Sequence, residues 1–418
     1  MRKSFSRAGF FKALGPGILF AGAAIGVSHV VQSTRAGAEF GFALLWLILL
    51  ANVLKFPFFE FGPRYAAATG ESLIDGYRRV GRWAFGLFLV LTVLTMFTIQ
   101  AGVTVVAAAL AENLFGFGWS VTAWSALILG TIALLLIAGK YPWLDRVTKV
   151  IVSLLAAAAL TAVVIAAFNG PAGDLSLAKP DLLSAATFAF VIALLGWMPA
   201  NFEISVWQSL WAIERAKETG HRPTLKEALA DFHIGYWLAT IYAVLFVALG
   251  ALVLFGTGES LSGSSVGFSA QLVGLFTATL GEWTWPVIAT AVFVTMFSTT
   301  LAVTDAYPRV WRRSIEIIAP EAKKAHEALY WMSLLIVGGG ALLIIAFLGG
   351  SLTRLVDLAA TISFISAPLF GYLGYRAVTH PHVPKEARPG RFVTVMAFLG
   401  GLFVSLFAIG FVLWRLLG

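Results

Sequence analysis

Long apolar runs alternate with short polar segments along the whole chain of 418 residues. A run of about twenty apolar residues forms a helix long enough to cross the hydrocarbon core of a bilayer. We therefore predict an all-α, polytopic integral membrane protein. The pattern predicts eleven spanning helices, near residues 14–35, 40–63, 83–112, 120–139, 144–168, 182–211, 232–256, 284–308, 329–349, 352–376 and 393–416.

Two of these spans lose their apolar character near the middle of the bilayer. The first reads GPGILFAGAAIGVSHVVQSTR over residues 15–35, where glycines are followed closely by polar side chains. The sixth contains LLGWMPANFEIS over residues 194–205, where Pro199 interrupts the apolar run. Polar groups at that depth are costly unless they face a cavity or a partner. We predict non-helical breaks near residues 22–28 and 195–201.

The positions of the two breaks predict an internal repeat. A cytoplasmic N-terminal segment, 1–13, precedes a first block of five helices over 14–168, and a second block of five follows over 182–376. The odd number of helices in a block places the two blocks in opposite orientations, and the first helix of each block is broken. Such paired breaks indicate the binding site of a secondary transporter. The helix at 393–416 is an addition to this 5+5 arrangement.

Composition and charge support this class and exclude others. Hydrophobic residues make up 59% of the chain and charged residues only 12%. Most of the 29 Lys and Arg residues fall in segments on one side of the predicted membrane, which places the N-terminus in the cytoplasm of a bacterial-type inner membrane. The net charge of +8 therefore reflects topology, and we expect no nucleic-acid partner. The absence of cysteine excludes thiolate ligands. We expect no enzyme activity, no bound cofactor and no ATP-driven pumping, since no Walker A motif occurs.

Several motifs resemble those of the Nramp (natural resistance-associated macrophage protein) family of divalent-metal transporters. They are GPG followed by a polar break, AGAEFGFALLW, AAATGESL at 66–73, GKYPWLDRVTKVIVSLL at 139–155, and Met198-Pro199. The similarity is clearest over about residues 14–210. The resemblance implies the LeuT-like inverted-repeat fold shared with amino-acid and sodium-coupled transporters, with helices 1 and 6 broken.

The chain departs from the pattern of that family at the positions that bind metal and protons. The family carries an Asp-Pro-Gly-Asn run in its first helix, and an ungapped count places Gly26 at the Asp position and His29 at the Asn position. The sixth-helix Met is kept as Met198, but the His two residues later is Ala200. The two acids of the third helix are replaced by Gln100 and by a valine. The metal site and the proton route that the resemblance implies are both altered.

The candidate substrate-binding residues lie at the two predicted breaks. A neutral imidazole, a thioether, an amide and one carboxylate could bind a divalent metal. Each of these residues also has a purely structural interpretation. The histidine and the methionine could pack in the interior, and the amide of Asn201 could bond to backbone groups that Pro199 leaves without a partner. The substrate-binding candidates are Gly26, His29, Gln32, Ser33, Met198, Asn201 and Glu203, and the metal-ligand candidates among them are His29, Met198, Asn201 and Glu203.

Other buried polar residues are candidates for coupling or gating. Gln100 either replaces a coupling acid or bonds a neighbouring helix. Arg35 and Glu39 have the spacing of a local ion pair at an outer gate. Asp305 either binds an ion or holds Arg309, four residues later. Two further charges need partners within the membrane: Lys55 in the second span, and Asp357, for which the sequence suggests Arg354.

Two functions remain open from the sequence. The first is secondary transport of a divalent cation through an altered site with a single carboxylate, where retained waters complete the coordination of the metal. The alternative is a carrier of a small organic or anionic solute that keeps the fold and has lost metal binding, since half-helix N-termini favour anionic groups. A receptor without transport is disfavoured because no appended signalling domain is visible. The expected partners are the lipid bilayer and the metal ion or small solute that is carried.

Overall fold

The computed structural model describes residues 6–139, 141–177, 180–181 and 184–417. These residues form helices and connecting loops, with no β-strand among them. The first five residues of the N-terminal segment 1–13, and residues 182–183 at the start of the predicted second repeat, lie outside the described part. The α-helices are α1 (Arg7–Ala13), α2 (Pro16–Ala24), α3 (Thr34–Phe40), α4 (Leu45–Thr69), α5 (Leu73–Val80), α6 (Arg82–Phe115), α7 (Val121–Ile137), α8 (Tyr141–Asn169), α9 (Ala185–Trp197), α10 (Ile204–Thr219), α11 (Leu225–Val253), α12 (Ser265–Leu280), α13 (Trp285–Ile318), α14 (His326–Leu348), α15 (Leu352–Val378) and α16 (Arg391–Leu417). The other helical segments are η1 (Ser28–Ser33), η2 (Leu175–Leu177), η3 (Glu282–Thr284), η4 (Pro320–Ala325) and η5 (Lys385–Ala387).

Each of the eleven predicted spans coincides with a helix or with a broken helix. By length and apolar composition alone, seven of the described helices could cross a membrane, or eight if the bent pair of helix 1 counts as one span. Two of the remaining predicted spans do not form one long helix. α7 has only 17 residues, and the sixth span is divided between α9 and α10.

Helix 1 is broken as predicted. α2 ends at Ala24. The chain becomes helical again at Ser28 in η1, a π-helix with wider turns than an α-helix, which continues into α3. The two halves of helix 1 are bent by 44° relative to each other. Such wide turns are uncommon and occur frequently at functional sites. Gly26 lies in the break against α13, where an added Cβ would approach Thr299 Cγ2 to 2.7 Å. Position 26 therefore has no room for a side chain, because α13 occupies the space beside it.

Helix 6 is broken as well. α9 ends at Trp197, and α10 begins at Ile204, so six residues that include Pro199 separate the two halves. Gly196, in the last turn of α9, packs against the backbone carbonyl of Ala360 on α15 and leaves no room for a side chain. The close packing of α9 on α15 fixes where the first half of helix 6 ends.

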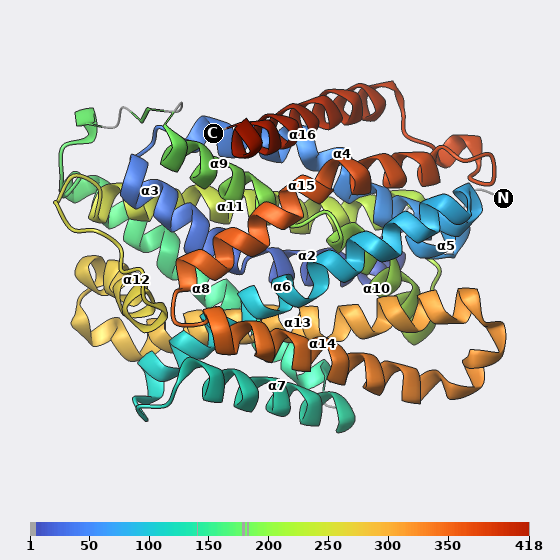
Figure 1. Ribbon diagram of the computed structural model, residues 1–418, viewed down its shortest axis with the longest axis horizontal. Helices are drawn as coiled ribbons and strands as arrows, with labels where there is room; N and C mark the ends of the chain where they lie inside the picture. The colour runs from blue at the N-terminus through green and yellow to red at the C-terminus, as the bar shows by residue number, and fades with distance from the viewer. Residues whose placement is uncertain (1–5, 140, 178–179, 182–183, 418) are drawn as a thin grey trace.

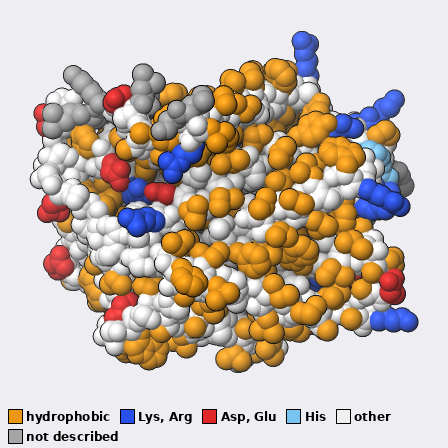
Figure 2. Space-filling view, viewed as in Figure 1, with side chains coloured by type: hydrophobic (Ala, Val, Ile, Leu, Met, Phe, Trp, Pro, Cys, Tyr) orange, Lys and Arg blue, Asp and Glu red, His pale blue; other side chains and the backbone are white. Residues whose placement is uncertain are grey.

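The helices run roughly parallel to the long axis of the molecule, with the two broken helices in its interior (Figure 1). α11 packs against both halves of helix 1, α13 packs against α6 and α2, and α15 packs against α9. The N-terminus and α5 lie at one end, and α3 and α12 lie at the opposite end (Figure 1). Figure 2 shows hydrophobic side chains over the middle of the face and Lys and Arg side chains gathered at the end that carries the N-terminus.

Candidate functional site

A small cavity, which we call the central chamber, lies between the breaks of helices 1 and 6. Its wall comes from helix 1, from α6, from the helix 6 break with α10, and from α13. It encloses about 20 Å³, enough for about one water molecule. The lining is mostly apolar, and its hydroxyl and amide side chains are Ser28, Asn201 and Thr299. These three residues come from three different elements.

Ser28 connects the two breaks. Its hydroxyl lies 2.8 Å from the carbonyl oxygen of Ala24 and 3.2 Å from that of Pro199, on helix 6. His29 is fully buried beside it, and its Nδ1 lies 2.7 Å from Ser28 Oγ and 2.7 Å from the Ala24 carbonyl oxygen. The His29 ring also faces the backbone carbonyl of Ala239 on α11, and His29 is not part of the chamber wall. The structure therefore brings Ser28, and not the His29 side chain, to the chamber.

The polar groups of the helix 6 break are satisfied by neighbouring helices. Glu203 is buried, and its Oε1 and Oε2 accept hydrogen bonds of 2.5 Å from the hydroxyls of Thr95 on α6 and Tyr307 on α13. Asn201 lines the chamber and donates to Glu203 Oε2 over 3.5 Å. Glu203 therefore joins helix 6 to α6 and α13 through hydroxyl donors, and no arginine pairs with it among the described residues.

The carbonyl groups at the end of α9 bind a lysine. Lys55 on α4 is fully buried, and its Nζ donates to the carbonyl oxygens of Leu195, at 2.8 Å, and Met198, at 2.7 Å. Its Nζ also lies 5.1 Å from the centre of the Phe202 ring. The Met198 side chain is buried outside the chamber wall. The backbone of Met198, and not its thioether, therefore has the polar contact at this break.

Gln100 bonds within the helix bundle. Its Nε2 donates to Thr104 Oγ1 at 3.1 Å and to Thr304 Oγ1, on α13, at 3.0 Å. Asp305, the next residue on α13, accepts from Arg309 Nε at 2.7 Å and from the Tyr330 hydroxyl at 2.7 Å. Gln100 therefore links α6 to α13. Asp305 links adjacent turns of α13 and also joins α13 to α14.

A charged group at the end opposite the N-terminus, which we call the outer cluster, contains Gln32, Arg35, Glu39 and Asp357. Arg35 lies 2.7 Å from Asp357 Oδ1, 2.9 Å from Gln32 Oε1 and 3.4 Å from Glu39 Oε1. Gln32 also donates to Asp357 at 2.9 Å. Asp357 thus binds a residue of helix 1, and the nearby Arg354 that the sequence suggested is not its partner.

The outer cluster lies at a wide opening. Arg35, Glu39 and Asp357 line a vestibule of about 490 Å³, together with residues of α9 and α16. The guanidinium of Arg35 also lies 4.8 Å from the centre of the Phe190 ring on α9. Ser33, between this cluster and the chamber, uses its hydroxyl to bond the Ser28 carbonyl at 3.2 Å. The cluster therefore joins helix 1 to α15 and α9 between the vestibule and the chamber.

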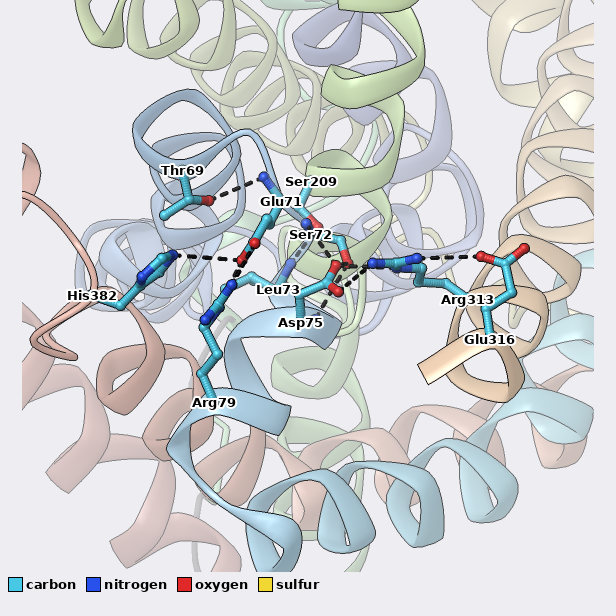
Figure 3. A network of polar contacts seen from close by, with 10 residues as sticks. All are labelled: Thr69, Glu71, Ser72, Leu73, Asp75, Arg79, Ser209, Arg313, Glu316 and His382. Atoms are coloured by element: carbon cyan, nitrogen blue, oxygen red, sulfur yellow. Dashed lines mark hydrogen bonds and ion pairs between the residues drawn. The ribbon is translucent and has the colours of Figure 1, made fainter. Parts of the chain in front are cut away.

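A second group, the inner network, closes the end that carries the N-terminus (Figure 3). Asp75 on α5 forms an ion pair with Arg313 on α13, and the backbone N–H of Leu73 donates to Ser209 Oγ on α10 at 3.0 Å. Glu71 forms an ion pair with Arg79 at 2.6 Å and raises the pKa of that guanidinium above its usual value through this contact. The network ties α5 to both α10 and α13, two of the helices that border the chamber.

The family follows from comparison with known sequences. The family described as "Natural resistance-associated macrophage protein-like" matches residues 17–414. The chain belongs to the Nramp-like family. It is 36% identical over 374 residues to an uncharacterized protein of Pasteurella multocida, covering 88% of this chain and 85% of that one. It is 25% identical over 271 residues to the divalent metal cation transporter MntH of Latilactobacillus sakei, covering 61% of this chain and 58% of that one.

Solved structures show the same fold. The Eremococcus coleocola manganese transporter superposes with a TM-score of 0.74 at 13% identity, covering 98% of this chain and 88% of the other. MhsT, solved with L-phenylalanine, superposes with a TM-score of 0.61 at 16% identity and covers 98% and 100%. The fold is therefore the LeuT-like inverted repeat of two five-helix blocks with an additional helix, as the sequence predicted.

Within this Nramp-like fold, the predicted metal ligands are not gathered at one point. No group of three or more His, Asp and Glu side chains that could hold a metal ion occurs in the described ranges. Asn201 and Glu203 are neighbours, while His29 and Met198 lie outside the chamber wall. Gly26 lies against Thr299 and supplies no ligand.

Sequence reasoning missed four residues that the structure places at the site. Ser28 and Thr299 line the chamber, and Thr95 and Tyr307 hold Glu203. Ser28 is one of several polar residues in the first break. The π-helical turns of η1 orient these residues differently from an α-helix, so the sequence pattern did not show which of them faces the chamber. The hydroxyl residues on α6 and α13 carried no such signal, because single threonines and tyrosines are common in membrane helices.

Proposed function

We propose that this protein is an Nramp-type secondary-active transporter that moves divalent metal cations by alternating access. The observation that carries the proposal is the meeting of two broken helices at one small chamber, with a vestibule toward one end and a polar network at the other. The family match, the divalent metal cation transporter MntH and the E. coleocola manganese transporter support the choice of cargo. Access would alternate by opening the inner network while the outer cluster closes.

The metal would be held with few charges. Asn201 and Glu203 supply an amide and a carboxylate beside the chamber, and His29 and Met198 must turn toward it in another state of the cycle to complete the site. For this contact the His29 ring must leave the backbone carbonyls of Ala24 and Ala239. With one carboxylate, we expect weaker binding and more retained water than at a site with two.

The second candidate cargo is a small organic or anionic solute. The specific observation in its favour is Lys55, which places a positive charge at the helix 6 carbonyls, where a bound metal would be repelled. The hydroxyl and amide groups of Ser28 and Asn201 would then bind the solute by hydrogen bonds.

The protein is proposed to lie in a bacterial-type inner membrane with its N-terminus in the cytoplasm. The gathering of Lys and Arg side chains at the end that carries the N-terminus supports this orientation (Figure 2). The C-terminus of α16 lies toward the opposite end (Figure 1).

Calorimetric titration with Mn²⁺ tests the metal site. We expect saturable binding that is lost in His29→Ala and weakened in Asn201→Ala, while Met198→Ala shifts selectivity from soft toward hard ions. Binding should weaken in acid, because a protonated imidazole cannot ligate a metal. Lys217→Gln, at an exposed position on α10, is the matched control. Unchanged binding in His29→Ala, or no Mn²⁺ binding by the parent, would refute the metal site and favour the organic solute.

A further inference from the structure

Lys55 is a buried cation whose hydrogen bonds both go to the protein backbone. Its side chain comes from α4, is 0% exposed, and reaches the carbonyl oxygens of Leu195 and Met198. Glu60, on the same helix, is paired with Arg64 instead. A lysine in the hydrocarbon region normally has a carboxylate partner or reaches the interface with its ammonium group. Lys55 does neither, so its function must come from the carbonyls that it contacts.

Those carbonyls have the chemistry of a cation site. They lie at the end of α9, where the last carbonyl groups of a helix have no intrahelical partner and carry the negative end of the helix dipole. In folds with broken helices, the unwound carbonyls and the C-terminal ends of half-helices coordinate small cations. The Lys55 ammonium, at 2.7 and 2.8 Å from two of them, occupies the position that a free cation would take. The Phe202 ring, 5.1 Å away, adds a favourable cation–π contact.

We propose that Lys55 is a built-in cation that fills the carbonyl site at the helix 6 break, so that this site binds no free cation. The charge is tethered to α4 and is therefore not exchanged with solution. Coupling by a free monovalent ion at this point is not needed, and any metal cargo must be held by other atoms. The inference rests on the proposed transporter function only through the broken helix 6, and it holds for either candidate cargo.

A lysine that only stabilises the end of the helix and one that replaces a cation differ in one measurable respect. If Lys55 replaces a cation, its removal must leave a site that an alkali ion can fill, and a ligand that binds only the folded state raises the apparent stability. We expect the thermal unfolding midpoint of Lys55→Met to rise saturably with Na⁺ or K⁺ when N-methyl-D-glucamine keeps the ionic strength constant. The parent and the control Lys12→Met, at an exposed position on α1, should show no such rise. A folded Lys55→Met without cation dependence, or a parent with the same dependence, would overturn the proposal.

Chemical rescue covers the case in which Lys55→Met does not fold. Lys55→Ala leaves space along the lost side chain, and propylammonium can enter it and donate N–H groups to the two carbonyls. We expect propylammonium to restore folded protein and to raise its unfolding midpoint, whereas 1-propanol, which lacks the charge, and tetramethylammonium, which lacks N–H donors, should not. Equal effects from all three, or none from propylammonium, would refute the proposal. These measurements need no transport, so they can succeed when uptake of metal fails.

Discussion

At the scale of single residues, several polar groups in the middle of the molecule form hydrogen bonds with one another. Glu203 accepts hydrogen bonds from Thr95 and Tyr307, and Gln100 donates to Thr304. A buried carboxylate needs such partners, because after removal of one of them the free-energy cost of taking the carboxylate out of water is no longer offset by that hydrogen bond. The hydroxyls therefore hold in place the acidic group that the proposed metal site uses.

The partner of Glu203 on α13 gives a direct test. Tyr307→Phe removes one hydroxyl donor and leaves the ring packed against Trp207, at a centroid distance of 5.2 Å. We expect the loss to cost about 1–3 kcal/mol, because a buried charged acceptor keeps one bond fewer. The decrease in the thermal unfolding midpoint of the protein in detergent measures this loss of stability. Tyr375→Phe is the control, because Tyr375 is partly exposed and its hydroxyl has no hydrogen bond among the residues that the structure describes; an equal effect there would contradict the explanation.

The residues show what the sequence could predict and what it could not. The breaks were predictable because glycine, proline and polar side chains interrupt apolar runs at fixed places. The partner of Lys55 was not, because backbone carbonyls have no signature in the sequence. Asp357 was assigned to Arg354 by local spacing, whereas its partner is Arg35, 322 positions away along the chain. Contacts between distant segments depend on packing that spacing does not reveal.

At the scale of elements, the break of helix 1 is held by close packing against α13. Thr299 fills the space beside Gly26 and donates from Oγ1 to the Gly22 carbonyl at 2.9 Å. The hydroxyl thus binds one of the carbonyl groups near the end of α2. The same residue lines the central chamber, so the shape of the break and the size of the chamber are linked.

Gly26→Ala should destabilise this packing. Its Cβ would approach Thr299 Cγ2 to 2.7 Å, and overpacking of a well-filled interior costs about 1–3 kcal/mol. Gly22→Ala is the matched control, since no heavy atom lies within 4 Å of its added Cβ. We expect a lower unfolding midpoint for Gly26→Ala, partial recovery on adding Thr299→Ala, and no loss for Gly22→Ala. A midpoint for Gly26→Ala equal to that of the control would show that the break does not depend on this contact.

The inner network connects elements that must separate if the chamber opens toward the N-terminal end. Arg313 joins α13 to α5 through Asp75, and Figure 3 shows the guanidinium between Asp75 and Glu316. Because the chain has no cysteine, Ala23→Cys places a unique label in the chamber wall. We expect Arg313→Ala to speed alkylation of this cysteine by a membrane-impermeant reagent added from the N-terminal side of the vesicle.

The control for this experiment is the neighbouring arginine. Arg312 lies over the Tyr330 ring, with its guanidinium carbon 5.9 Å from the ring centre. Arg312→Ala therefore removes a positive charge from the same end of α13 without breaking the pair with Asp75. Equal acceleration by both variants would mean that the charge itself, and not the connection between helices, controls access.

At the scale of the whole molecule, the two ends differ, which is consistent with the alternating access proposed above. A vestibule of about 490 Å³ opens at the outer cluster, while the central chamber encloses only about 20 Å³ and the inner network closes the other end. The fold was predictable at this scale, because helix number, order and breaks follow from the apolar pattern. The cargo was not, because Gly26 and His29 depart from the residues that the resemblance implies for metal binding, and Gln100 departs from those it implies for the proton route.

Uptake into proteoliposomes tests the central proposal most directly. The purified parent should take up Mn²⁺ saturably, and Asn201→Ala should lose that uptake because it removes the amide at the chamber wall, while Lys217→Gln, on the surface of α10, should keep it. Small organic and anionic solutes measured in the same vesicles should not be taken up. Saturable entry of a solute by a parent that moves no Mn²⁺ above protein-free liposomes would contradict metal transport and establish the second candidate.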